Sequence, residues 1–445
     1  MKRLIETISN IWKIEELRSR ILTTLGLLLI YRLGSYVVLP GVDSVALAKV
    51  NANNGGGILD LINIFAGGAF SRASIFALGI MPYISASIVI QLLGMAIPYF
   101  QRLQKEGESG RRRINQITRF LTIIIVAFQA PGYIATQVPA VVDGMMVRPD
   151  TFLWWLTTVI LLVAGTMFIM WLGERITERG IGNGISLIIM IGIISRLPFA
   201  FVSEFASRIE SGGLVIFLIE IAMLLIVIMT SVLLVQGTRR IPVQFAKRIV
   251  GNKQYGGVRQ FIPLKVNAAG VMPIIFAQAI MFIPITLAGF SDSLSGIAAT
   301  FSDFTGFWYN FVFALMIIAF TYFYTAVTVN PQQMADDMKR NGGFIPGIKP
   351  GKKTAEFLDN VLSRITLPGS IFLAIVAILP AFASMFGVSQ AFAQFFGGTS
   401  LLIMVGVILD TLQQIESHLL MRHYDGLMKT GRIKGRSSTG MGMAG

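Results

Sequence analysis

Ionisable side chains inside the apolar segments are the first candidates for chemistry, and they are few. Arg32, Glu220 and Asp410 each interrupt an apolar run, and charges at membrane depth are functional candidates by default. They do not form the series of facing acidic groups that a proton relay needs. We expect Arg32 to reach the interface along its flexible stem and Glu220 to bond a neighbouring helix.

Metal and nucleophile chemistry lack the residues they need. The chain has no cysteine and two histidines, His418 and His423, both near the end of the last apolar segment. A metal site needs three or four clustered ligands. An intramembrane protease needs paired aspartates, a Ser/Lys pair or zinc ligands, and the sequence contains no such arrangement. The sequence therefore predicts a protein that is not an enzyme, with no catalytic residue, metal or cofactor.

A glycine-rich run at 173–186 has some features of a phosphate-binding turn, because a helix N-terminus with glycine can hold an anion. It lacks the Gly-Lys-Ser/Thr ending and follows no strand pattern. We interpret its glycines as permitting a tight turn and close helix packing.

The elements around these residues are long and apolar. The chain has 445 residues, of which 54% are hydrophobic and 13% charged, whereas a soluble protein has about 25% charged residues. This composition predicts an all-α polytopic membrane protein. Ten spanning segments follow from length and hydropathy: 21–39, 74–96, 114–137, 151–173, 183–201, 214–236, 269–290, 307–329, 367–386 and 399–420.

The distribution of Lys and Arg predicts the orientation. Loops and tails on the N-terminal side hold 31 of them, the opposite side holds five, and Arg32 lies within the first helix. Under the positive-inside rule, the N-terminal segment 1–20 and the C-terminal tail 422–445 are cytoplasmic. On the same side, loop 237–266 has seven basic and no acidic residues, and loop 330–366 is rich in Gly and Pro. Loops of this length are usually functional or disordered, so we expect them to dock a partner.

One apolar stretch is too short to be an ordinary span. Residues 58–71 would reach roughly 20 Å as a helix, less than the ~30 Å hydrocarbon core. The stretch also contains Asp60, Asn63 and the pair Gly67-Gly68. A short, broken apolar segment at membrane depth must be shielded by protein or line a water-filled cavity.

Seven stretches, in order and at matching spacing, resemble the SecY family, the channel subunit of the Sec protein translocase. They are residues 71–93, 106–112, 176–186, 239–243, 263–273, 344–351 and 397–403. The resemblance covers nearly the whole chain. It implies two inverted five-helix halves, 21–201 and 214–421, around a central pore, with an external hinge loop at 202–213. It also implies a channel that conducts unfolded secretory polypeptides and releases transmembrane segments laterally into the bilayer.

The resemblance implies roles for particular residues. Six isoleucines form the pore ring: Ile80, Ile84, Ile189, Ile193, Ile275 and Ile403. Within it, Ile80 and Ile84 are four residues apart and share a helix face, as do Ile189 and Ile193. The half-helix 58–71 becomes a plug on the outer side, with Ile58, Leu61, Ile64, Phe65, Gly67 and Gly68 as its principal residues. Gln91 takes a lateral-gate position between the second helix and the seventh and eighth.

The implied partners are SecE, SecG, the SecA ATPase, the ribosome, translocating polypeptides with their signal sequences, and anionic lipid, without direct nucleotide binding. The implied location is the bacterial inner membrane. The residues expected to dock the ribosome or SecA are Arg239, Arg240, Lys247, Arg248, Lys253 and Lys349. Bacterial relatives often have arginines where this chain has Asn252-Lys253 and Lys349. Charge is mostly kept, but the planar fork of arginine is lost.

A secondary transporter also fits ten helices with one broken element. It would need buried charges or a polar site at the membrane midplane, where this chain places isoleucines. Transport of a secretory precursor, compared with transport of a small solute, separates the two functions.

Overall fold

The computed structural model describes residues 14–47, 63–142, 145–210, 213–245, 248–250, 253–255, 259–288 and 305–429. Within these ranges a helix occupies each of the ten predicted spans. The helices are α2 Glu15–Gly34, α5 Met81–Ala96, α7 Glu108–Gln137, α8 Phe152–Arg179, α9 Gly184–Glu210, α10 Leu214–Gln236, α11 Met272–Ala288, α13 Phe307–Thr328, α15 Lys352–Met385 and α17 Gly398–Lys429.

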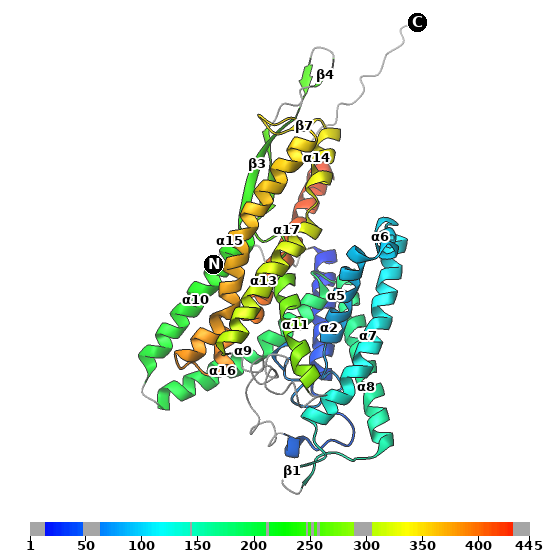
Figure 1. Cartoon of the computed structure of the whole chain (residues 1–445), viewed down its shortest axis with the longest axis vertical. Coiled ribbons are helices and arrows are strands. Elements are labelled where there is room, and N and C mark those ends of the chain that lie inside the picture. Colours follow the sequence, from blue (N-terminus) through cyan, green and yellow to red (C-terminus); the bar gives the residue numbers. More distant parts are fainter. Residues whose placement is uncertain are drawn as a thin grey trace.

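Seven of the described helices are long and apolar enough to cross a membrane, and an eighth is obtained if α5 and α6 (Pro98–Lys105) count as one span bent by 102°. α2 falls short because its charges, among them Arg18, Arg20 and Arg32, are spread along its length. α11 has only 17 described residues. Applied to the described helices alone, these criteria give fewer spans than the ten helices that the fold arranges side by side (Figure 1).

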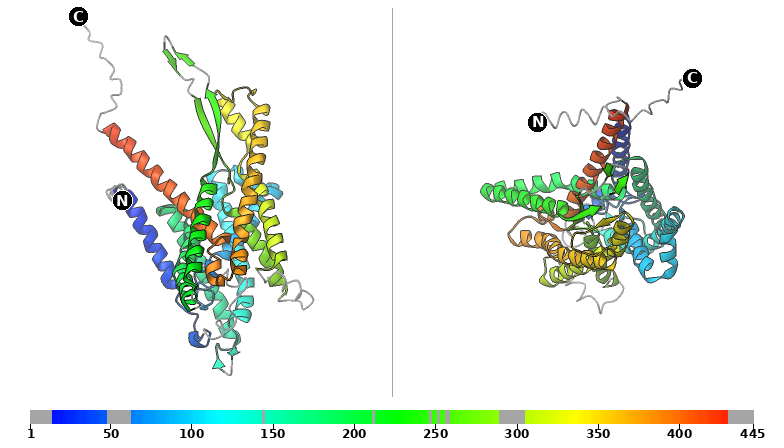
Figure 2. Two further views of the ribbon diagram at one scale, coloured as in Figure 1. Left: turned by 90° about the vertical axis from the view of Figure 1, so that its left-hand side faces the viewer. Right: turned by 90° about the horizontal axis from the view of Figure 1, so that it is seen from above.

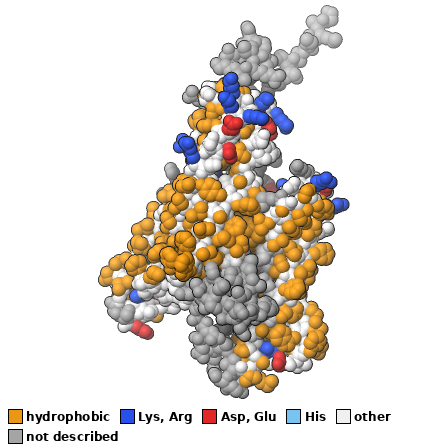
Figure 3. Space-filling view, viewed as in Figure 1, with side chains coloured by type: hydrophobic (Ala, Val, Ile, Leu, Met, Phe, Trp, Pro, Cys, Tyr) orange, Lys and Arg blue, Asp and Glu red, His pale blue; other side chains and the backbone are white. Residues whose placement is uncertain are grey.

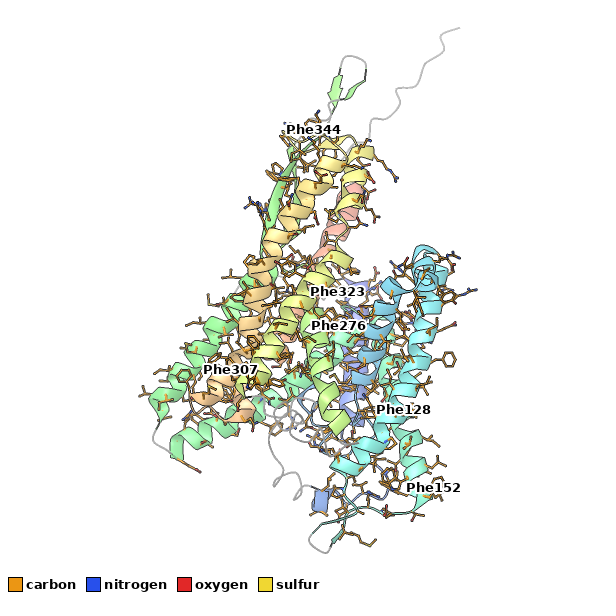
Figure 4. The ribbon with its side chains drawn as sticks, viewed as in Figure 1. Phe128, Phe152, Phe276, Phe307, Phe323 and Phe344 are labelled. Carbon is orange, nitrogen blue, oxygen red and sulfur yellow. The ribbon has the colours of Figure 1, made fainter. Side chains whose placement is uncertain are left out.

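The helices form two groups that meet along α9. α5 packs on α6, α7 and α8, whereas α11 packs on α13, and α13 on α15. α9 contacts α2 and α8 of the first group and also α10, α17 and the short α16 (Gln390–Ala393) of the second. Viewed from above, the two groups lie on opposite sides of the centre of the molecule (Figure 2). Large apolar side chains, including Phe128 and Phe307, point outward along the flanks (Figure 4), as lipid-facing helices require.

The basic loop at 237–266 is a β-hairpin rather than an irregular loop. β3 (Thr238–Phe245) pairs antiparallel with β6 (Arg259–Lys265), and β7 (Gly343–Phe344) joins the other edge of β3. β4 (Arg248–Val250) and β5 (Lys253–Tyr255) pair at the hairpin's far end. Side chains alternate along a strand, so Ile241 and Val243 point to one side and are buried against Leu358 of α15.

The second long loop, 330–366, is also mostly regular. Asn330 caps α14 (Pro331–Arg340) by accepting hydrogen bonds from the backbone N–H groups of Gln332 and Gln333. α15 begins at Lys352, well before the predicted start at 367, because Leu358 and Leu362 lie on one helix face and pack beneath the hairpin. We call the end of the molecule that holds this hairpin and α14 the basic end; Lys and Arg side chains gather there (Figure 3).

The predicted start of the second span is wrong. α5 begins at Met81 instead of residue 74, because the preceding residues form turns in which Gly67, Gly68 and Gly79 have positive φ. Pro82 then occupies the first turn of the helix, where proline is tolerated. A small hairpin of β1 (Val141–Val142) and β2 (Met145–Met146) lies at the same end.

The external hinge loop expected at 202–213 is helical over most of its length. α9 continues through Pro198 to Glu210, and α10 begins at Leu214. The helix persists because the buried Glu204 and the half-buried Arg208 contact Ser389, Glu220 and Gly387 of other segments.

Candidate functional site

The six isoleucines expected to form the pore ring are all buried in the structure. Ile80 is the N-cap residue of α5 and Ile84 lies in its first turn. The other four are on α9, α11 and α17. All six are buried and belong to one cluster of buried hydrophobic residues, to which both groups of helices contribute. β-branched side chains have few rotamers, which suits these residues to a stiff constriction. We refer to the six isoleucines as the collar.

The described part of the segment predicted to be the plug, residues 63–71, contributes to the same buried cluster. Ile64 and Phe65 are buried in the same cluster as the isoleucines. The helix predicted over 58–71 is seen only at 63–65 and is followed by turns. Gly67 and Gly68 have φ values of 62° and 86°, which glycine adopts without strain. Ile58 and Leu61 lie outside the described residues.

Hydrogen bonds from neighbouring elements hold this segment. Tyr133 of α7 donates from its hydroxyl to the Phe70 carbonyl at 2.7 Å. Arg32 of α2 donates to the Gly67 carbonyl at 3.1 Å, so this arginine binds the turn rather than reaching for the interface as expected. The Ser71 N–H donates to Asn63 Oδ1 at 3.1 Å and closes the loop. These donors come from the first group of helices and from the segment itself.

α9 approaches the segment through a glycine. A Cβ atom built on Gly192 would lie 2.5 Å from the Phe65 carbonyl oxygen and 3.3 Å from the Gly67 nitrogen. Real Cβ atoms do not come that close to backbone, so only glycine allows this packing. Gly192 directly precedes Ile193, so the contact brings the segment close to one residue of the predicted ring. Sequence analysis did not single out Gly192, because a glycine within an apolar helix carries no signal of what it packs against.

Glu220 is accounted for by an ion network that the sequence did not reveal. Arg208 of α9 contacts the carboxylates of Glu204 at 2.9 Å and Glu220 of α10 at 2.6 Å. It also donates to the Gly387 carbonyl at 2.7 Å, and the Ser389 N–H donates to Glu204 Oε2 at 2.9 Å. The inter-helix bond expected for Glu220 is confirmed. The i,i+4 spacing of Glu204 and Arg208 favours an ion pair on one helix face, but a loop is expected at 202–213 from the sequence.

The glycine-rich turn between α8 and α9 directs its N–H groups at protein acceptors. Ile181 N–H donates to Thr24 Oγ1, Gly182 N–H to Gln414 Oε1 at 2.8 Å, and Gly184 N–H to Thr177 Oγ1. Gly182 has a φ of 84°, and the turn packs on α2 and α17. These donors are therefore satisfied internally, which agrees with the packing interpretation rather than with phosphate binding.

The other predicted site residues lie apart from the collar. Gln91 is half-buried near the C-terminal end of α5, while Phe276 of α11 joins the collar cluster and stacks on Phe320 of α13 with ring centroids 5.7 Å apart (Figure 4). Arg239 and Arg240 on β3 and Lys349 in the turn before α15 are exposed at the basic end. Arg248 and Lys253 lie on β4 and β5, and Lys247 is outside the described residues.

Comparison with known proteins places this geometry in a family. The SecY family model matches residues 74–412. SecY of Streptomyces scabiei is 43% identical over 439 residues, covering 96% of this chain and all of that protein. SecY of Vibrio cholerae is 43% identical over 433 residues, covering 95% and 96%.

Solved structures agree on the fold. A protein-conducting channel superposes with a TM-score of 0.63 at 18% identity, covering 90% of this chain and 92% of that one. Sec61 from a canine ribosome–channel complex has a TM-score of 0.59 at 16% identity with the same coverage. The ten-helix channel fold expected from the sequence is therefore confirmed, and the chain belongs to the SecY family, the channel-forming subunit of the Sec protein translocase.

Proposed function

We propose that the isoleucine collar is the constriction through which unfolded secretory polypeptides cross the membrane. The observation that carries this proposal is the convergence of all six isoleucines, from four helices in both groups, in one buried apolar cluster. Water in so apolar a gap lacks hydrogen-bond partners, and an ion would shed its hydration without replacement ligands. A collar of this kind blocks ions while closed and yields when a polypeptide separates the helices.

Residues 58–71 serve as the plug on the outer side of the collar. The contacts of Phe65 and Gly67 with α9 and α2 support this role, because they seat the segment directly on the ring. α5 makes its extensive helix contacts within its own group. This supports a lateral gate between α5, near Gln91, and the pair α11 and α13, through which transmembrane segments leave for the bilayer.

The orientation and partners follow the charge distribution. The basic end faces the cytoplasm of a bacterium, with both termini there and the chain in the inner membrane. SecE and SecG complete the complex, and SecA or the ribosome docks on the hairpin and on Lys349. The exposed Arg239 and Arg240 support this, since charged surfaces steer association. The chain itself has no catalytic role and leaves nucleotide hydrolysis to its partner.

Cysteine cross-linking tests the pore assignment directly, since the chain has no cysteine of its own. We would reconstitute Ile403→Cys and Ile80→Cys with SecE and SecA and stall a secretory precursor that carries one cysteine. Both collar variants should form a disulfide with the precursor. The control Ile160→Cys, on an exposed position of α8, should not. Equal cross-linking at 160 and 403 would contradict the assignment.

The docking surface is tested by salt dependence. Replacing Arg239 and Arg240 with Gln should weaken SecA or ribosome binding, and the remaining affinity should depend less on salt, because exposed charges are screened. The measurement is binding affinity across a salt series. Replacement of Arg112, an exposed arginine of α7 at the same end but outside the hairpin, provides the control. Unchanged affinity in the hairpin variant would contradict the proposal.

A further inference from the structure

A small cavity lies inside the second group of helices. It has a volume of about 40 Å³ and is enclosed by α11, α13, α15 and the start of α17. α13 packs on both α11 and α15, and α15 packs on α17 (Figure 1). The helices meet here through buried hydrophobic residues, yet four of the side chains that line the cavity are polar: Gln278, Tyr309, Gln394 and Thr399.

These four side chains are buried without the hydrogen-bond partners that they need. Each is at most 6% exposed. Within the described ranges, Gln394 Oε1 is buried and has no hydrogen-bond partner. No hydrogen bond among the described residues involves the side chain of Gln278, Tyr309 or Thr399. Buried polar groups without partners are unfavourable and are rare in native proteins, so the cavity requires an occupant that forms hydrogen bonds.

The lining selects a small and neutral occupant. Among the residues that the structure describes, no Lys, Arg, Asp or Glu lines the cavity, so no opposite charge would compensate a bound ion. Amide and hydroxyl groups both donate and accept hydrogen bonds, as water does. A buried water needs roughly 10–15 Å³ of such volume and about two to four polar partners. The cavity therefore has room for about three water molecules.

We propose that this cavity is a binding site for a cluster of about three water molecules, which bridges α11, α13 and α17. Gln278 is three residues from Ile275 on α11, and Thr399 is four residues from Ile403 on α17. The cluster thus lies about one helical turn from two collar residues. Because a water bridge is nearly as favourable as a direct hydrogen bond, it holds these helices in position. The binding of water rests on the cavity alone, whereas its role in positioning the collar rests on the proposed pore.

Oxidation by hydroxyl radicals detects the bound water, because X-rays generate the radicals from water and each radical reacts with the side chain beside it. The wild-type protein, in complex with SecE in lipid nanodiscs, would be irradiated and its oxidation measured by mass spectrometry. Tyr309 should be oxidised several-fold faster than Tyr133, which is as deeply buried but donates its hydroxyl to the Phe70 carbonyl. Equal rates for the two tyrosines would overturn the proposal.

Removal of one water ligand provides a matched test. Thr399→Val deletes a hydroxyl of the cavity at nearly constant volume and should lower the rate of Tyr309 oxidation about twofold, since the cluster loses one of its polar partners. Thr158→Val changes a buried threonine of α8 that is outside the cavity lining and should leave the rate unchanged. Unchanged oxidation of Tyr309 in the Thr399→Val variant would overturn the site.

Resting ion conductance in planar bilayers tests the positioning role separately. Thr399→Val should raise the conductance, because the bridge between the two collar helices is weakened, and Thr158→Val should not. Slower oxidation of Tyr309 together with unchanged conductance would overturn the positioning of the collar by water.

A density map of the wild-type protein identifies the occupant. Separate peaks within hydrogen-bonding distance of Gln278, Tyr309 and Gln394 are expected for water. One continuous, elongated peak would identify a lipid acyl chain or a detergent tail, and the absence of any peak in a map that shows other buried waters would indicate a dry cavity. Either result overturns the proposal. Neither the oxidation rates nor the map depend on conductance, so failure of the water site and failure of the proposed pore are distinguishable.

Discussion

The two groups of helices meet along two seams of opposite chemistry. On one seam, Arg208 ties α9 to α10 and to the loop after α15 through buried charges and backbone groups. On the other, α5 and α11 contribute residues such as Ile84 and Phe276 to the same buried apolar cluster. Ion networks are directional and costly to break, whereas apolar contacts are non-directional. The first seam therefore suits a fixed joint, and the second suits the proposed lateral gate.

The largest expected effect comes from breaking the charged seam. Arg208→Met should lower the free energy of unfolding by about 3–5 kcal/mol, because two buried carboxylates, Glu204 and Glu220, lose their cation. Unfolding of the purified protein measures this. The control is Arg112→Met, whose exposed pair with Glu108 should contribute at most about 1 kcal/mol. Equal losses in the two variants would contradict a structural role for the charged seam.

The next effect lies where the apolar seam meets the plug segment. Gly192→Ala places a methyl group 2.5 Å from the Phe65 carbonyl, and overpacking of this kind costs about 1–3 kcal/mol. We expect the segment to move off the collar and the resting ion conductance to rise, as measured in planar bilayers. In the control, Gly132→Ala on α7, a Cβ meets nothing within 4 Å. If both variants conduct alike, α9 does not seat the plug.

A polar side chain in the collar should raise the resting ion conductance by as much as Gly192→Ala does, or by less. Ile403→Asn supplies a hydrogen-bond partner to water and should wet the constriction, whereas Ile403→Leu keeps the apolar character and should change little. Single-channel recording without substrate compares the two. Ile160→Asn, on the exposed face of α8, controls for a polar residue in the membrane. If Ile160→Asn conducts ions as well as Ile403→Asn does, the collar is not the ion seal.

The apolar seam could be predicted from the sequence and the charged seam could not. Hydropathy located all ten helices, because membrane depth demands long apolar runs, and the resemblance to the SecY family identified the six isoleucines. Arg208 and Glu220 are 12 residues apart in sequence, with a chain reversal between them, and their third contact, Gly387, is remote. Ion pairing of this kind depends on tertiary arrangement. The hairpin was not predicted either, although Ile241 and Val243 alternate with exposed residues as in a strand that is buried on one face.

A polar contact also lies at the other end of α9. Its loss should have the smallest effect on the free energy of unfolding. Gly182 N–H, in the turn before α9, donates to Gln414 Oε1 of α17 at 2.8 Å. The α17 side chain is exposed, so water can replace the lost acceptor. A neutral hydrogen bond contributes about 0.5–1.5 kcal/mol, and access to water places this one at the lower limit.

Gln414→Leu should therefore lower the free energy of unfolding by about 0.5 kcal/mol, with Gln413→Leu, also exposed on α17, as the control for added apolar surface. Measured in the Arg208→Met background, the same change should cost the same amount, since distant contacts without shared partners add. A larger cost in that background would mean that the two ends of the seam are coupled. The charged seam would then act as one rigid hinge, and opening of the apolar seam would depend on the contacts at both ends of α9.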